Sequence, residues 1–280
     1  MSLKCGLHAM PYRILFRLFL GLLVAFSAQR PEVSAAEELP SGIHIATPVW
    51  EGQTQHDGTG FFFEMIRKIY EPRGIRVTWE FANWDRSLDL VKKGYADAMP
   101  SVWREDADAA GLKTPRLPLY LEYTAAVFKK STFPAWEGVA SLQGRSVVWF
   151  KGYDYHLRTP LAGLSMKWME IPSEGKPWRM LAADRADALI DARIDVDRYV
   201  EENLVDLAVF QVVPLWGQKA YLAFSDKGPA TDRLMRIFDE GMAELFVSGE
   251  LEKLHDQWAV QGFDARAWTE SGEIIAPLSR

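Results

Sequence analysis

The chain is poor in cysteine. Cys5 is the single cysteine among 280 residues, and it lies in a segment that we expect to be removed from the mature protein. A chain without a thiol forms no disulfide and no thiolate metal site, and it has no cysteine nucleophile. A lipid anchor would need a cysteine after the first apolar run, and none follows it. The mature chain must therefore be stable through its apolar core, which about 240 residues can supply.

Long apolar runs are also scarce. Residues 18–28 are apolar apart from Gly21 and Ser27, but these 11 residues fall short of the about 20 that a membrane-spanning helix needs. Basic residues precede the run (Lys4, Arg13 and Arg17), and small residues follow it at 33–36. This order is typical of a secretory signal peptide. We therefore predict that residues 1–36 are removed near Ala35 or Ala36, leaving a periplasmic protein with no stable membrane insertion.

Positive charge is in short supply. The whole chain has a formal net charge of −6, and residues 1–36 contain four positive residues and one negative residue. Removing them takes away a net +3, so the mature chain has a charge of −9. An acidic protein without a basic stripe is a poor nucleic-acid ligand, so we expect no such partner. The sequence also lacks an H-x-x-x-H metal pair, a G-x-S-x-G elbow and a phosphate loop, and we expect no cofactor.

Strand and helix patterns alternate in the first part of the mature chain. The patterns predict strands over 42–48, 75–81 and 96–102, and helices over 58–70 and 83–94. Such alternation favours a parallel sheet covered by helices.

A second alternating unit follows. Strands are predicted over 146–150, 166–171, 187–191 and 207–213, with helical segments over 154–163, 178–183 and up to 200. Two longer strands, 123–129 and 219–226, stand at the borders of this unit, and a helical stretch over 230–260 breaks at Gly249. The layout predicts an α/β fold of two lobes joined by two crossing strands. Lobe 1 would comprise 37–127 and 219–262, lobe 2 would comprise 128–218, and 263–280 would form a tail.

Several short motifs occur in an order that resembles the family 3 extracellular solute-binding proteins, which have the type II periplasmic binding fold. The resemblance covers about residues 41–262. The matching segments are GFFFE at 60–64, WDRSL at 84–88, KGYADA at 93–98, LPLY at 117–120, LQG at 142–144, VVWFKG at 147–152, RADA at 185–188 and GELEKLHDQW at 249–258.

The resemblance implies a binding protein rather than an enzyme. Its expected role is to capture a small polar solute, such as an amino acid or a related compound, and to deliver it to the permease of an ABC transporter. We expect a monomer whose lobes close around the solute by a hinge motion.

The resemblance also implies a place for an arginine that binds the α-carboxylate of amino acids. The family carries it in a T-x-x-R motif, and a guanidinium suits a carboxylate because it donates two parallel hydrogen bonds. Here an ungapped register places Ala109 at that position. Ser101 and Arg104 in the segment SVWR fit S-x-x-R five residues earlier. Arg104 either reaches the cleft through a rearranged loop or forms an ion pair with Glu105 or Asp108 at the surface.

In lobe 2, Gly152 lies in the loop after the strand at 146–150, and the family often has threonines just after it. This chain has Tyr153, Asp154 and Tyr155 there instead. Free backbone N–H groups of Gly152 and Tyr153 could donate to an anion at this turn. Asp191 stands near the family's aspartate for an ammonium group, and it could equally cap the following helix.

Aromatic and acidic residues complete the predicted site. Trp50 follows the first strand, where the family has a ring that stacks on the ligand. Near other predicted edges of the cleft are Trp84, Trp103, Tyr120 and Tyr153. Glu64 is the acidic residue of the GFFFE segment.

Two other functions are compatible with the resemblance. Periplasmic cyclohexadienyl or arogenate dehydratases share the fold, and Glu64, His56 or His156 could supply the general acid that such an enzyme needs. A ligand-sensing partner of a membrane protein is the other alternative.

Overall fold

The computed structural model describes residues 39–172 and 176–269. The described residues from Pro40 onward belong to one compact unit, and the description below concerns that unit. The predicted signal peptide, with Cys5, and the last part of the tail lie outside the described residues. Within the described residues, no helix is both long enough and apolar enough to cross a membrane.

Lobe 1 begins with the predicted alternation of strands and helices. Its first elements are β1 (Gly42–Thr47), α2 (Phe61–Tyr70), the 3-10 turn η1 (Glu71–Arg73), β2 (Arg76–Phe81), α3 (Trp84–Lys92), β3 (Ala98–Trp103) and α4 (Arg104–Ala110). The chain returns to this lobe at its end with α8 (Thr231–Val247), α9 (Glu250–Gln257) and α10 (Arg266–Thr269). The helix α4 was not predicted from the sequence.

Lobe 2 is smaller and has the same alternating pattern. It contains η2 (Gly138–Leu142), β5 (Ser146–Phe150), α5 (Tyr155–Arg158), β6 (Lys167–Ile171), α6 (Lys176–Ala182), β7 (Ala188–Ala192) and α7 (Arg193–Glu202). The helix predicted over 154–163 is too long, since α5 comprises only four residues. The loop that precedes it has two left-handed residues, Gly152 (φ 91°) and Asp154 (φ 45°).

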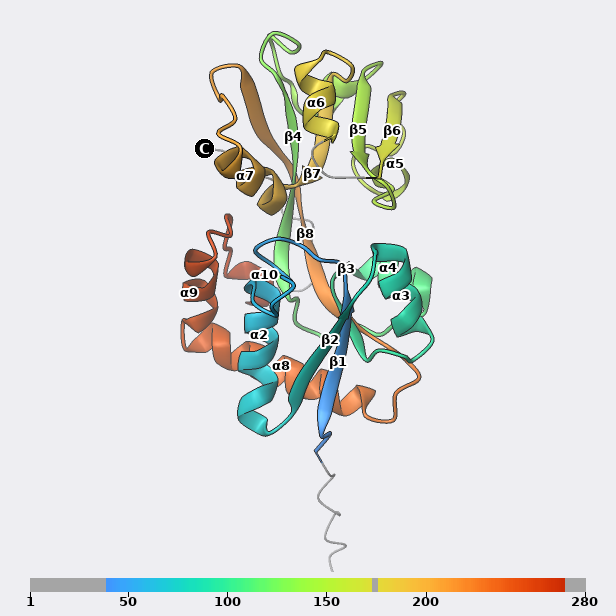
Figure 1. Cartoon of the computed structure of the whole chain (residues 1–280), viewed down its shortest axis with the longest axis vertical. Coiled ribbons are helices and arrows are strands. Elements are labelled where there is room, and N and C mark those ends of the chain that lie inside the picture. The colour runs from blue at the N-terminus through green and yellow to red at the C-terminus, as the bar shows by residue number, and fades with distance from the viewer. Residues whose placement is uncertain (1–38, 173–175, 270–280) are drawn as a thin grey trace, which may run out of the picture. The chain divides into compact units, whose positions relative to one another are not determined.

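Two long strands, β4 (Tyr120–Lys129) and β8 (Phe210–Phe224), join the lobes (Figure 1). One eight-stranded sheet runs through both lobes in the order β2-β1-β3-β8-β4-β7-β5-β6. Strands 207–213 and 219–226, predicted as separate, form the single strand β8. The sheet is mixed, because β4 and β8 are antiparallel to each other and to their outer neighbours. The predicted fold class, two α/β lobes with two crossing strands, is confirmed.

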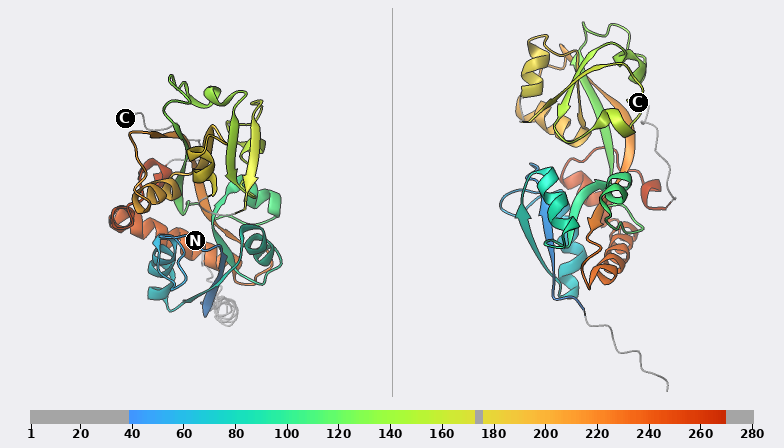
Figure 2. Two further views of the ribbon diagram at one scale, coloured as in Figure 1. Left: turned by 45° about the horizontal axis from the view of Figure 1, so that its top comes forward. Right: turned by 90° about the vertical axis from the view of Figure 1, so that its right-hand side faces the viewer.

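Each lobe has helices on both faces of its part of the sheet (Figure 2). In lobe 1, Ile43 and Ile45 of β1 face the core formed with α2, α8 and α9, while Ala46 faces the core formed with α3 and α4. Lobe 2 repeats the arrangement, since Trp149 and Val148 of β5 enter opposite cores. Alternation along each strand therefore fills two cores per lobe.

The described part of the tail packs on lobe 1. Trp268 of α10 is buried, and its indole N–H donates to the carbonyl oxygen of Pro118 at 3.1 Å. Its ring stacks on Phe263 with centroids 5.3 Å apart. Residues up to Thr269 thus extend the lobe 1 core.

Candidate ligand pocket between the lobes

A small pocket lies between the two lobes, where the β1–α2 loop faces the start of α7. Its cavity volume is about 50 Å³. Lobe 1 and β4 contribute Trp50, Gln53, Trp84, Ser101, Trp103, Asp106, Tyr120 and Glu122, and lobe 2 contributes Gly152, Tyr153, Tyr155, Ala192 and Asp195. Ligand sites in open α/β sheets also lie at strand ends and between domains.

A hydrogen-bonded group of three side chains forms the lobe 1 side of the pocket. Glu122 Oε2 accepts from the Tyr120 hydroxyl at 2.7 Å and from Ser101 Oγ at 3.2 Å. Ser101 has a left-handed backbone (φ 60°) at a register shift between β3 and β8. A bulge of this kind re-aims a side chain out of the regular ladder, and here it brings the Ser101 hydroxyl to Glu122.

Burial changes the acidity of this carboxyl group. Glu122 is 8% exposed, and burial raises its pKa from 4.5 to about 7. Hydrogen bonds from Tyr120, Ser101 and Trp103 lower the pKa of Glu122, and the charge of Asp195 raises it. The side chain therefore changes its charge near neutral pH.

Aromatic rings from both lobes line the pocket together with Glu122. On lobe 1, the rings of Trp50 and Trp84 lie 6.1 Å apart. Across the cleft, Trp84 is 6.4 Å from Tyr153, and Trp103 is 6.0 Å from Tyr155. The two tyrosines are 5.6 Å from each other. The pocket is therefore walled by ring faces and edges.

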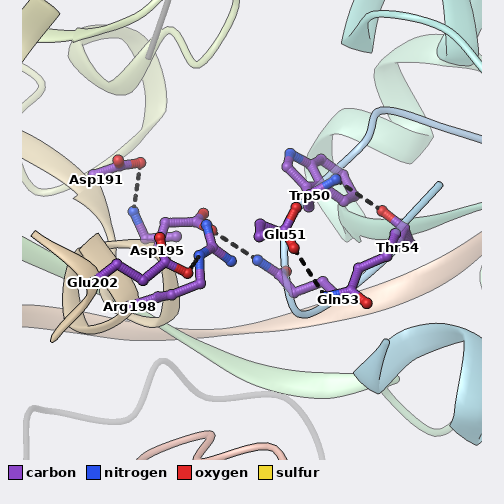
Figure 3. A network of polar contacts seen from close by, with 10 residues as sticks. Trp50, Glu51, Gln53, Thr54, Asp191, Asp195, Arg198 and Glu202 are labelled. Atoms are coloured by element: carbon purple, nitrogen blue, oxygen red, sulfur yellow. Dashed lines mark hydrogen bonds and ion pairs between the residues drawn. The ribbon is translucent and has the colours of Figure 1, made fainter. Parts of the chain in front are cut away.

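A polar contact also crosses the cleft (Figure 3). Gln53, on the β1–α2 loop, donates through Nε2 to Asp195 Oδ1 on α7 at 2.8 Å. Arg198, one turn further along α7, donates to the same oxygen at 3.2 Å. The bond from Gln53 to Asp195 therefore joins the two lobes beside the pocket.

A larger outer cavity of about 400 Å³ adjoins the pocket at the mouth of the cleft. The two share Trp84, Asp106, Gly152 and Tyr153. The other lining residues of the outer cavity are Asp85, Leu88, Asp89, Lys92, Ala109, Ala110 and Asp154. A solute could therefore place one end in the inner pocket and extend outward.

Both cavities are acidic. Among the described residues that line the inner pocket, three are carboxylic and none is arginine or lysine. Burial raises the pKa of the Tyr153 hydroxyl well above its usual value, and the charges of Asp191, Asp195 and Glu122 raise it further. The described residues contain no group of three or more His, Cys, Asp or Glu side chains that could hold a metal ion.

The structure brings most of the sequence-predicted site residues together. Six of them line the inner pocket: Trp50, Trp84, Ser101, Tyr120, Gly152 and Tyr153. Asp154 lines the outer cavity. Asp191 is buried at the end of β7, where Oδ1 accepts from the Ala192 N–H at 2.9 Å. The backbone N–H of Tyr153, expected as a donor to an anion, instead donates to the Phe150 carbonyl oxygen at 3.3 Å.

Arg104 does not lie among the residues that line either cavity. Its guanidinium donates to Thr114 and to the Pro115 carbonyl oxygen, and its Cζ lies 4.2 Å from the ring centroid of Tyr221. The reason is that Arg104 opens α4, which turns its side chain toward the strand β8 instead of the cleft. Ala109, at the family position of the arginine, lines the outer cavity.

Glu64 also lies outside both linings. Its carboxylate accepts from the Trp258 indole at 2.8 Å and from Gln257 Nε2 at 3.1 Å. Glu64 therefore ties α2 to the end of α9, because the first turn of α2 points it away from the cleft.

Sequence reasoning missed part of the inner pocket. Trp103 was expected only near an edge of the cleft, and Tyr155 only in the loop after the strand at 146–150. The residues not predicted at all are Gln53, Asp106, Glu122, Ala192 and Asp195. Glu122 carried a detectable signal, since it is the one charged residue within the otherwise apolar or hydroxyl-bearing stretch 117–128. A charge in a buried strand is rare unless it is paired or functional.

No protein family and no curated protein matches the chain by sequence. Solved structures do match. A histidine kinase sensor domain with similarity to periplasmic binding proteins aligns with a TM-score of 0.66 and 20% identity, over 79% of this chain and 97% of that one. The chain has the two-lobed periplasmic binding protein fold.

Amino-acid-binding proteins share this two-lobed fold. An ancestral arginine-binding protein bound to arginine aligns with a TM-score of 0.64 and 17% identity, over 79% of this chain and 99% of that one. An amino acid ABC transporter substrate-binding protein from Streptococcus pneumoniae, bound to L-arginine, aligns with a TM-score of 0.63 and 20% identity, over 78% and 94%. The structural similarity establishes the fold, but sequence identities this low do not identify the ligand.

Proposed function

We propose that the chain is a periplasmic solute-binding protein that captures a small polar solute between its lobes and presents it to the permease of an ABC transporter. The observation that carries the proposal is the pocket between the lobes, which is lined by residues of both. A ligand in such a pocket contacts both lobes only when they are together, so it stabilises the closed state by its differential affinity. Substrate-binding proteins of ABC transporters have the same fold.

A ligand screen tests the proposal. The mature protein is mixed with a panel of amines, amino acids, sugars and carboxylic acids, and thermal unfolding is followed. A ligand present at 100 times its Kd should stabilise the fold by about 2.7 kcal/mol. Small-angle scattering should then show a more compact protein with that ligand.

Two variants assign the ligand to the pocket. Trp50→Ala should weaken binding about fivefold or more, since a stacked ring contributes on the order of 1 kcal/mol or more. Trp168→Ala removes a half-exposed tryptophan on β6, outside both cavities, and should leave the affinity unchanged. Equal affinity in the two variants would place the ligand elsewhere.

The dehydratase alternative receives less support from the geometry. Such an enzyme needs cationic groups for the two carboxylates of its substrate, whereas the described lining of the inner pocket is acidic. The three acids considered for it do not line the pocket. His56 lies edge-on to Phe81, His156 stacks on Trp168, and Glu64 is bonded to Trp258. We expect no turnover of arogenate or prephenate in a direct assay.

We extend the proposal to organisation and location. The lobes comprise 37–127 with 219–262, and 128–218, and the secreted chain works in the periplasm as a monomer after cleavage of its signal peptide. Mass spectrometry of the secreted chain and light scattering in solution check these points. A sensing role, in which the closed protein contacts a membrane receptor instead of a permease, would use the same pocket. Solute uptake by cells lacking the protein distinguishes the two roles.

A further inference from the structure

The first turn of α7 makes two different contacts with lobe 1. Asp195 lines the inner pocket and accepts from Gln53 of the β1–α2 loop at 2.8 Å (Figure 3). The preceding residue, Ile194, does not line that pocket. It is partly buried and packs against the core of lobe 1 that contains α2, α8 and α9. Among the described residues of lobe 2, Ile194 is the single one that packs against this core.

The part of lobe 1 that Ile194 contacts is the segment 258–262, which follows α9. Val260 of this segment is 7% exposed. Val260 and Ile194 line a void of only about 10 Å³, together with residues of β4. Trp258 and Gln261 also share the lining of a larger cavity with Ile194. The start of α7 therefore packs on this segment, and little free space is left between Ile194 and Val260.

The segment 258–262 is held at both of its ends. At its start, the Trp258 indole donates to the Glu64 carboxylate of α2 at 2.8 Å. At its end, Gly262 lies directly against the ring of Tyr123 on β4, since a Cβ on Gly262 would lie 2.4 Å from the Cε2 atom of Tyr123. Lobe 2 therefore packs against a segment that is fixed by lobe 1 and by a linking strand.

The apolar contact and the polar bond are coupled by the helix. Ile194 and Asp195 are consecutive residues of one helical turn, so neither moves without the other. A rotation of lobe 2 that separates Ile194 from the segment 258–262 also takes the Asp195 carboxylate away from Gln53. Packed atoms resist closer approach, whereas a hydrogen bond needs a set distance and angle. The apolar contact therefore limits the closure, and the polar bond forms at the angle that results.

From the proposed function we propose further that Ile194 is a positioning residue of the ligand pocket. Its contact with the segment 258–262 stops lobe 2 at the angle at which Asp195 lies at the inner pocket and bonds to Gln53. Ile194 thus acts on a solute through Asp195, without touching the solute.

A labelled protein without solute tests the inference. Cys5 is the single cysteine and lies in the predicted signal peptide, so Tyr95→Cys on lobe 1 and Leu204→Cys on lobe 2 provide two sites for spin labels. Both positions are exposed. Pulsed electron paramagnetic resonance measures the distance between the labels and so the ratio of closed to open molecules. Ile194→Ala should lower this ratio about fivefold or more, because it removes most of an apolar contact between the lobes.

A double-mutant cycle distinguishes positioning from simple support. Gln53→Ala should lower the ratio about fivefold in the otherwise unchanged protein and much less in the Ile194→Ala background, because the bond to Asp195 is then already lost. Two independent supports would instead add. Leu207→Ala removes a side chain of similar size from lobe 2 that is 51% exposed, and it should leave the ratio unchanged.

Titration of Glu122 gives a second readout that a purely structural role would not change. Burial raises the pKa of Glu122 to about 7, and the charge of Asp195 contributes to the increase. Opening of the lobes in Ile194→Ala should move this pKa toward 4.5. Carbon NMR of the labelled carboxyl groups measures it, with Glu122→Gln identifying the signal.

The outcomes separate this inference from the proposed function. Equal ratios in Ile194→Ala and Leu207→Ala overturn the inference, as does a wild type that stays open without solute, and additive effects in the cycle overturn the positioning role. Melting curves report whether each variant is folded, and Ile194→Val carries the test with a smaller shift if Ile194→Ala is not. The thermal screen decides the proposed function independently, since binding of no solute overturns it even where the cycle shows coupling.

Discussion

The two sides of the pocket are built differently. On lobe 1, Glu122 lies within β4, and its carboxylate accepts hydrogen bonds from the hydroxyl groups of Tyr120 on β4 and Ser101 on β3. On lobe 2, Asp195 lies in the first turn of α7 and is held by Arg198 and by Gln53 from the other lobe. The lobe 1 side is thus complete by itself, whereas the lobe 2 side includes a bond that exists only when the lobes meet. The comparison indicates that a solute would first bind lobe 1 and then be covered by lobe 2.

The largest predicted effect comes from a substitution in the core that packs behind the lobe 1 side of the pocket. Phe62 is fully buried, and its ring lies 6.3 Å from Trp50 and 5.0 Å from Tyr120. Phe62→Ala should lower the free energy of unfolding by about 3–5 kcal/mol, because it leaves a large cavity in the core. Chemical denaturation measures the loss. Leu204→Ala changes an 88% exposed side chain and serves as the control.

The titration of Glu122 gives the second-largest predicted effect, a pH dependence of the free energy of unfolding. Its pKa is about 7 in the folded protein and near 4.5 when it is exposed to water. The folded state therefore binds the proton more tightly, so the contribution of Glu122 to stability is fully present below about pH 4.5 and is lost as the pH rises through about 7. The unfolding free energy of the wild type relative to Glu122→Gln should fall by about 3 kcal/mol over this range.

Several groups surround Glu122 and must be considered in this pH experiment: Tyr120 on its own strand, Ser101 and Trp103 on β3, Asp106 on α4, Asp195 on α7, and Tyr153 and Tyr155 from lobe 2. Comparison with Glu122→Gln cancels their common contribution. Glu252→Gln, at an exposed position of α9, should follow the wild type. A wild-type curve parallel to that of Glu122→Gln would contradict the raised pKa.

A substitution at Gly60 tests whether the β1–α2 loop of lobe 1 can accommodate a side chain at this position. Its φ is 122°, and a Cβ there would lie 2.3 Å from the carbonyl oxygen of Gln53. Gly60→Ala should destabilise the protein by more than about 2 kcal/mol and weaken ligand binding, since the clash moves the loop that carries Trp50 and Gln53. Gly111→Ala has a similar left-handed backbone (φ 72°) but open space, and it should cost about 1 kcal/mol. Urea denaturation distinguishes the two.

The smallest predicted effect concerns the bond between the lobes. Gln53→Ala removes the hydrogen bond to Asp195, which contributes about 1 kcal/mol to the closed state. Scattering from the protein without ligand should then show a larger radius of gyration, while the melting temperature changes little. Gln55→Ala removes a bond to Glu51 within the same loop and should leave the radius unchanged. An unchanged radius in both variants would show that other contacts keep the lobes together.

Local sequence patterns predicted the two-lobed fold well because most strands and helices carry their own signal, although α4 was not predicted. The helix predicted over 83–94 is an example, since Asn83 caps α3 by accepting from the Arg86 N–H at 2.9 Å. The single strand β8 was missed because Pro214 and Gly217 interrupt its pattern, whereas pairing along β4 keeps the strand continuous. The continuity of β8 comes from its pairing with another strand, and a local sequence pattern carries no information about that partner.

The pocket was harder to predict, for a similar reason. Trp50 and Trp84 follow strands or open helices, and such positions meet at one edge of a sheet. Arg104 has the right residue type in nearly the right place, but the helix α4 that begins with it turns the side chain away. Asp195 and Gln53 are 142 positions apart in the chain, and their contact depends on how the lobes meet. Motif order alone does not determine such pairings.

The linking ribbon of β4 and β8 has one more consequence. Its hydrogen-bond register slips between Thr124 and Ala125, opposite Trp216 and Pro214, so one residue of β8 is left over between the lobes. Proline has no amide hydrogen to donate, so the ladder is weakest where the chain leaves one lobe for the other. Rotation of the lobes would concentrate at this point, and amide exchange at residues 124–125 and 215–216 would slow when a solute occupies the cleft.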